Sequence, residues 1–141
     1  MSNTQINGRK VLVKYPSSAI FALFSDLTNF TKSLPSEMLQ KNGVVATTDT
    51  LIAKAQGFEI GLKIEEKVPY TLVRYGQFGN SPVAYNFMVH LFPVGESETE
   101  FMLEMNAELS GMIKVMVGGK LQELVDKVTD QVEIALNGLH G

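Results

Sequence analysis

The last third of the chain constrains the fold more than any other part. Residues 99–109 alternate between apolar and polar side chains, which is typical of a strand with one buried face. Residues 110–137 then place apolar side chains at helical spacing, and a helix of this length measures roughly 40 Å. A helix that crosses a whole small domain must bury its apolar stripe against a sheet or other helices. The pattern therefore predicts a helix packed on the preceding strands.

Other segments show the same period-two alternation, and the clearest of them spans residues 58–67. Short turn sequences at 68–70, 79–82 and 93–97 separate these segments, so consecutive strands are expected to run antiparallel. Strands are predicted at 10–15, at 44–55 as two short strands or one bent strand, and at 58–67, 72–78, 83–92 and 99–109.

Two short helices are predicted between the first strand and the others. Pro16 ends the first strand, and Ser17 or Ser18 is suited to cap the helix that follows. Asp26 either ends this helix or caps a second one, and another break falls at 34–36 with a short turn or helix after it. The first helix carries an apolar stripe at helical spacing, made of Ile20, Phe21, Leu23, Phe24 and Leu27.

The final helix contains two adjacent glycines, Gly118 and Gly119. Each glycine inside a helix costs about 1 kcal/mol relative to alanine, so a kink or frayed turn is expected there. Ser110 is placed to cap the helix, and Met112 and Met116 are expected to begin its inward, apolar side.

These elements predict an α+β fold in which the sheet grips the last helix. Strands with one apolar face need a cover, and the long helix has the largest apolar area to offer. A twisted sheet curls around such a helix and leaves a hollow where the two diverge. We therefore expect a curved antiparallel sheet of about six to seven strands wrapped around a long C-terminal helix, with residues 1–141 forming a single domain.

Composition removes several classes of function. The net charge is −3 and the basic residues are scattered, which argues against nucleic acid as a partner. The chain has no cysteine, and its two histidines lie far apart, so neither thiolate chemistry nor a zinc pattern is expected. No cofactor and no metal are expected. No apolar run is long enough for a membrane span, no signal peptide is expected from the first 15 residues, and a cytoplasmic location is expected.

Local motifs resemble those of a known superfamily. The Val-Leu-Val run at 11–13, the Phe-Ala-Leu-Phe-Ser-Asp-Leu run at 21–27, the Leu-Pro pair at 34–35 and Pro16 are the residues that carry the resemblance. Together with the order of elements, they resemble the START/Bet v1-like superfamily, also called the polyketide cyclase/dehydrase and lipid transport group, and in particular its small bacterial stand-alone domains. The resemblance implies a helix-grip fold with an internal cavity for an apolar or amphipathic ligand.

Aromatic and methionine side chains on the predicted inner face are candidates for lining such a cavity. Ligand sites are mostly apolar and carry a few polar groups that orient the ligand, and Tyr75, Gln77 and Tyr85 are the candidate polar groups. Ordinary core packing is the alternative interpretation of the set. The candidate ligand-binding residues are Phe58, Tyr75, Gln77, Tyr85, Phe87, Phe101, Met105, Met112 and Met116.

No convincing catalytic constellation emerges from the sequence. His90 has the strand parity of the outer face, and Asp26 is suited either to acid–base chemistry or, more commonly, to capping the next turn. Three functions stay open: binding of a small hydrophobic or amphipathic ligand for transport or sensing, a cyclase/dehydratase-like enzyme, and a protein-interaction module with a filled core. The last predicts an exposed patch around Phe78, Met88 and Phe92. The oligomeric state is open, and a weak dimer is compatible with the pattern.

Overall fold

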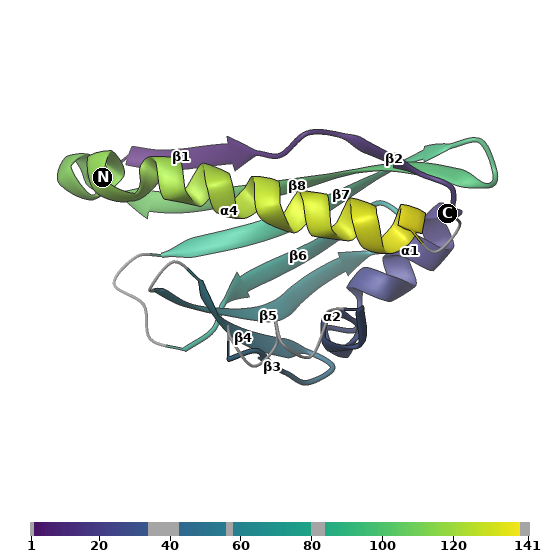
Figure 1. The fold of residues 1–141 in the computed structure, drawn as a ribbon, viewed down its shortest axis with the longest axis horizontal. Helices are drawn as coiled ribbons and strands as arrows, with labels where there is room; N and C mark the ends of the chain where they lie inside the picture. Colours follow the sequence, from purple (N-terminus) through teal and green to yellow (C-terminus); the bar gives the residue numbers. More distant parts are fainter. Residues whose placement is uncertain (1, 34–42, 56–57, 80–83, 139–141) are drawn as a thin grey trace.

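The computed structural model describes residues 2–33, 43–55, 58–79 and 84–138. They form one antiparallel sheet with the strand order β1-β8-β7-β6-β5-β4-β3, in which β2 also pairs with β8 (Figure 1). The strands are β1 (Ser2–Asn7), β2 (Val11–Val13), β3 (Val45–Ala46), β4 (Thr50–Ala55), β5 (Phe58–Val68), β6 (Leu72–Gln77), β7 (Tyr85–Val94) and β8 (Glu98–Leu109).

The sheet has eight strands in the described residues, where six to seven were predicted, because β1 was missed. Ile6 is the only large apolar side chain between Ser2 and Asn7, so the alternation that marks a strand is weak there. Both β1 and β2 pair with β8, and the amide of Gly8 between them donates to the carbonyl oxygen of Leu103 at 2.8 Å. These backbone bonds to β8 hold β1 in the sheet.

Three helices complete the described structure: α1 (Ser17–Phe24), α2 (Thr28–Ser33) and α4 (Gly111–Gly138). The α4 helix is continuous through the two glycines, so the chain does not fray there, and the predicted kink stays a prediction. A cost of about 1 kcal/mol per glycine is small compared with the burial of the same helix further along. The predicted serine cap of α1 is wrong, because Pro16 takes the N-cap position without a side-chain hydrogen bond. The segment after the 34–36 break lies outside the described residues.

The C-terminal half of α4 packs on the edge of the sheet formed by β1, β2 and β8 (Figure 1). Val125, Thr129 and Leu136 are buried there. A Cβ atom at Gly8 would lie 2.8 Å from Oγ1 of Thr129 and 3.1 Å from Cγ1 of Val125, so helix and strand approach closely at this glycine. Arg9 bonds carboxylate oxygens of the helix at 2.6 and 2.7 Å, those of Asp130 and Glu133.

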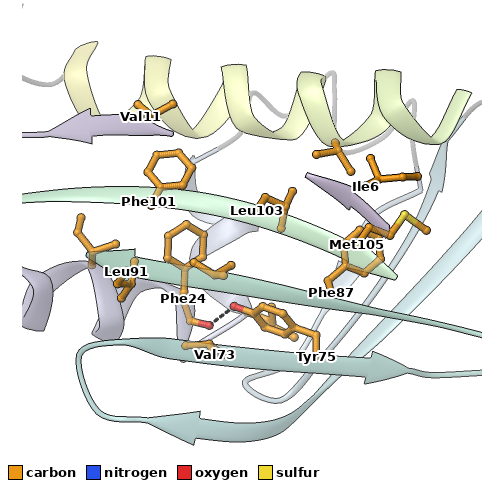
Figure 2. Close-up of a cluster of buried hydrophobic side chains, with 14 of the residues drawn as sticks. Ile6, Val11, Phe24, Val73, Tyr75, Phe87, Leu91, Phe101, Leu103 and Met105 are labelled. Atoms are coloured by element: carbon orange, nitrogen blue, oxygen red, sulfur yellow. Dashed lines mark hydrogen bonds between the residues drawn. The ribbon is translucent and has the colours of Figure 1, made fainter. Parts of the chain in front are cut away.

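Buried side chains from the sheet, α1 and α4 form one continuous core. Figure 2 shows Phe101 between α4 and Phe24 of α1, with Leu91 beside Phe24 and with Met105 and Phe87 further along. The α1 helix covers the part of the inner face where β6, β7 and β8 carry Val73, Val89 and Phe101. The core is therefore closed most completely at the end of the sheet beside α1.

Candidate functional site

The inner face of the sheet can be followed row by row, because directly paired residues of antiparallel strands point to the same side. One fully buried row crosses the middle of the sheet, and we call it the central row. Its members pair in register from β6 to β1, in the order Tyr75, Phe87, Met105 and Ile6. Ile64 of β5 pairs with Tyr75 and extends this row.

The next row, on the side away from α1, is the rim row. Its β3–β6 part consists of Ala46, Leu51, Leu62 and Gln77, and its β7–β1 part of Tyr85, Ala107 and Thr4. Of these side chains only Ala107 is fully buried, and the others are half-buried although they face inward. Apolar surface on this part of the inner face is therefore incompletely covered by the described helices.

Tyr75 is buried, and its hydroxyl is already used by the fold. It donates a hydrogen bond to the main-chain oxygen of Phe24 at 2.5 Å, which ties β6 to the end of α1 (Figure 2). Burial raises the pKa of the Tyr75 phenol well above its usual value. The sequence-based expectation that Tyr75 faces inward is confirmed by its burial, but its hydroxyl is committed to the protein.

Replacing Tyr75 with phenylalanine should lower the free energy of unfolding by about 1–2 kcal/mol, because a buried hydrogen bond is lost. The raised pKa adds a pH signature. The unfolded chain ionises Tyr75 at about pH 10 and the folded chain only at higher pH, so this tyrosine stabilises the fold fully below about pH 10 and progressively less above it. Urea denaturation of both proteins should therefore show a difference that narrows above pH 10. A constant difference would contradict the buried hydrogen bond.

The hydroxyl of Tyr85 links β7 to the main chain of β5. It accepts a hydrogen bond from the amide of Gly61 at 3.0 Å and donates one to the carbonyl oxygen of the same residue at 2.8 Å. Its ring meets that of Phe87 edge-on, with 6.0 Å between the ring centroids. Burial is the main reason that the pKa of Tyr85 is raised. Tyr85 reaches across the end of β6 to β5 and serves as a side-chain partner for the main chain.

Two polar side chains of the rim row, by contrast, have no hydrogen-bond partner among the described residues. The hydroxyl oxygen of Thr4 is buried and makes no hydrogen bond to the described residues. The amide of Gln77 likewise makes none with the part of the chain that is described. Sequence reasoning named Gln77 but missed Thr4, because the first strand was not predicted. The only sequence signal for this strand was the single apolar residue Ile6 among polar neighbours, and Thr4 lies two positions before it.

Phe87, Phe101 and Met105 are buried on the inner face, as their strand parity predicted. Phe101 lies in the closed part of the core, where its ring centroid is 6.1 Å from that of Phe24. The other two belong to the central row, directly beside the rim row. The side chain of Phe58 lies outside the described residues. Whether any of these side chains touches a ligand stays a prediction.

Met112 and Met116 do not face the core, which corrects the expected orientation. They are 77% and 68% exposed, and Val115 between them is 87% exposed. The first turns of α4 extend beyond the rows of the sheet that bury its C-terminal half, so the described residues leave this apolar stripe uncovered. Open space also surrounds Gly119, since a Cβ atom there would meet nothing within 4 Å.

Asp26 caps a turn. One carboxylate oxygen accepts hydrogen bonds from the amide of Thr28 at 2.9 Å and from its hydroxyl at 2.6 Å. The hydroxyl bond and then the amide bond lower the pKa of Asp26, so it is ionised at neutral pH. An ionised carboxylate that accepts two hydrogen bonds from the next turn has a structural role, which agrees with the capping alternative.

His90 lies on the outer face, as predicted, and interacts with a carboxylate. Its Nε2 atom is 3.0 Å from Oε1 of Glu104, and the amide of Asn106 donates to the other carboxylate oxygen at 2.7 Å. Glu104 is only 9% exposed, because these neighbours and the surrounding sheet cover it. This polar cluster points away from the inner face, so it is not part of the candidate site.

Phe78, Met88 and Phe92 do not form one apolar patch. Phe92 pairs with Glu100 near the β7–β8 turn, stacks on His90, and lies beneath the ammonium group of Lys10 at 4.7 Å. Phe78 follows the opposite end of β6. This separation weakens the interaction-module hypothesis in its original form.

Neither a metal-binding cluster nor a membrane-crossing helix is found among the described residues. They contain no group of three or more His, Cys, Asp or Glu side chains that could hold a metal ion. Among their helices, none combines the length and apolar character that a membrane crossing requires.

The comparisons with known proteins rest on structure alone. No family model matches the chain, and no curated protein matches it. Norcoclaurine synthase from Thalictrum flavum, in complex with dopamine and hydroxybenzaldehyde, has a TM-score of 0.73 at 14% identity and covers 98% of this chain and 86% of its own. The Zhui aromatase/cyclase from Streptomyces sp. R1128 has a TM-score of 0.67 at 11% identity over 97% and 93%.

A START superfamily protein from Mycobacterium smegmatis is also similar, with a TM-score of 0.61 at 13% identity over 96% of this chain and 98% of that one. Identities this low show the fold only. The chain therefore has a START/Bet v1-like helix-grip fold, as its sequence motifs implied.

Proposed function

We propose that this protein binds a small hydrophobic or amphipathic ligand between the inner face of its sheet and α4, along the rim row. The observation that carries the proposal is the half-burial of Leu51 and Leu62, two apolar side chains that face inward without being fully covered. Inward apolar surface normally packs against protein, and a ligand supplies the missing contact. The fold supports the proposal, because norcoclaurine synthase holds small aromatic molecules in a similar scaffold.

The remaining candidate residues fit around this position. Tyr75, Phe87 and Met105 of the central row form the floor of the proposed site, and Gln77 and Tyr85 lie on the rim row itself. Met112 and Met116, on the exposed first turns of α4, would border its entrance. Phe101 is the described candidate that lies away from this position, because its ring packs against Phe24 in the closed part of the core.

Binding without turnover is preferred to a cyclase/dehydratase-like reaction. Acid–base chemistry needs titratable groups that converge on the substrate. The inward strand positions of the described residues carry no carboxylate and no imidazole. The hydroxyls of the two inward tyrosines, Tyr75 and Tyr85, already donate hydrogen bonds to main-chain carbonyl oxygens. This arrangement favours ligand binding over catalysis.

Filling the site should block binding. Leu62→Trp places a large ring on the rim row, whereas Lys63→Trp puts the same ring on the exposed outer face of the same strand. We expect Leu62→Trp to weaken binding of the neutral apolar probe N-phenyl-1-naphthylamine at least about tenfold, equivalent to about 1.4 kcal/mol. Lys63→Trp should bind the probe like the parent. Fluorescence titration measures both.

Equal probe binding by the two variants would contradict the proposed position. Native mass spectrometry of the parent protein, purified from its own host, tests the function independently. A protein that is always empty, and whose melting temperature no lipid or aromatic compound raises, would refute ligand binding altogether.

A further inference from the structure

We propose that the ligand is electrically neutral and presents a hydroxyl or carbonyl group to Thr4 and Gln77. This inference rests on the proposed function and adds the chemical class of the ligand to it. Its basis is a pair of polar groups on the rim row, a hydroxyl and a carboxamide, that make no hydrogen bond within the described part of the chain.

Sheet register places both groups on the same face. Thr4 pairs with Ala107, and Ala107 pairs with Tyr85. Gln77 pairs with Leu62 of β5. On its other side, the neighbouring pair Gly76–Asn86 places Gln77 next to Tyr85 of β7. Thr4 therefore lies at one end of the rim row and Gln77 near its middle, and the small side chain of Ala107 and the ring of Tyr85 lie between them. A ligand lying along this row would meet Thr4 at one end, Gln77 near the middle, and the apolar side chains of Leu62 and Leu51 beyond Gln77.

The hydroxyl of Thr4 is the more demanding of the two groups. A buried hydroxyl that has lost water and gained no partner is unfavourable, and nearly all buried polar groups in proteins are bonded. Its neighbours do not satisfy it, because Ala107 has no polar side-chain atom and the Tyr85 hydroxyl is bonded to Gly61 on both sides. A ligand hydroxyl or carbonyl would supply the missing hydrogen bond.

The charges around the site exclude an anionic partner for these groups. Among the described residues, Lys54 and Lys63 have the outward strand parity, and Arg9 is paired with two carboxylates of α4. The described members of the central and rim rows include no lysine or arginine. Lys67 has inward parity, since it pairs with Val73, but it is exposed and lies near Asp26 at the α1 end of the sheet, away from the rim row. Burying a carboxylate or phosphate without a cation is far more costly than burying a neutral group that can be hydrogen-bonded. The geometry therefore favours an alcohol, ketone or similar neutral amphipath over a fatty acid.

The test compares three probes with the same alkyl chain: dodecanol, dodecanoate and dodecane, each displacing N-phenyl-1-naphthylamine at pH 8. We expect dodecanol to compete at a concentration at least about tenfold lower than dodecanoate, and several-fold lower than dodecane. The double variant Thr4→Val/Gln77→Leu should lose the preference for dodecanol over dodecane. Gln5→Leu, an exposed position with the opposite parity on β1, should keep it.

Folding of the variants is checked by their melting temperatures without ligand. Thr4→Val replaces an unpartnered hydroxyl with a methyl group of similar size, so the variant should melt no lower than the parent. A lower melting temperature would show that the hydroxyl already has a partner and would overturn the inference. Equal or tighter competition by dodecanoate would also overturn it, while leaving ligand binding intact. Failure of all three probes to compete would instead count against the proposed function.

Discussion

Replacing Phe101 with alanine is expected to lower the free energy of unfolding by about 3–5 kcal/mol, the usual cost of truncating a buried phenylalanine. Phe101 is 1% exposed and pairs with Leu91 and Val11, and its ring packs against that of Phe24. Sheet, α1 and α4 meet at this ring (Figure 2), so the cavity left behind cannot close by moving one side chain. Domains of this size are stable by only about 5–15 kcal/mol, so the variant should be near its limit of folding.

Phe92 provides the matched control for this experiment. It lies on β7 next to Leu91 in sequence, faces the opposite side of the sheet, and is 38% exposed. Phe92→Ala loses only partly exposed ring surface and the contact with the Lys10 ammonium group, and it should cost no more than about 1 kcal/mol. Urea denaturation of both variants checks the comparison. Similar losses of stability would show that the inner and outer faces are assigned incorrectly.

Gly61→Ala is the second change with a large expected effect. A Cβ atom at Gly61 would overlap the main-chain oxygen of Phe78, and a main-chain atom cannot swing aside as a side chain can. The strand end would have to shift, which would disturb the hydrogen bond from the Phe78 amide to Gly61 at 3.1 Å and both bonds to the Tyr85 hydroxyl. Overpacking of this kind costs about 1–3 kcal/mol, and we expect the upper end of that range.

Gly76→Ala is a control of the same chemistry on the adjacent strand. A Cβ atom there would meet the carboxylate of Glu65, which is the far end of an exposed, flexible side chain. The glutamate can rotate away, so the stability should change by less than about 1 kcal/mol. Chemical denaturation separates the two cases. If both alanine variants were equally stable, the close approach of Phe78 to Gly61 would be wrong.

The strands that were predicted correctly have strong alternation and a buried inner face. Residues 58–67 and 99–109 were predicted within one residue of β5 and β8. The β1 strand was missed for the opposite reason, since its place in the sheet comes from main-chain bonds to β8 and leaves little trace in side-chain type. The β7 strand runs two residues beyond its predicted end to Val94, because Pro93 and Val94 still pair across to β8.

Strand parity also predicted which way most candidate site residues point. Tyr75, Phe87 and Met105 are buried where the alternation placed them. The helix was harder to interpret, because an apolar stripe does not reveal how far along it the protein provides cover. Met112 and Met116 share the character of the buried residues further along α4, yet the sheet does not reach them.

By itself, the sequence determined the order of the elements, the inner face of most strands, and the presence of a long helix to cover them. The periodicity of apolar side chains carries that information because it depends only on which face of a helix or strand is buried and which is in water. Only the tertiary structure decided that β1 closes the sheet, that Thr4 and Gln77 share a row, and that the Tyr75 and Tyr85 hydroxyls are used by Phe24 and Gly61. These facts depend on contacts between distant segments, and the register that creates such contacts is set by main-chain pairing across the whole sheet.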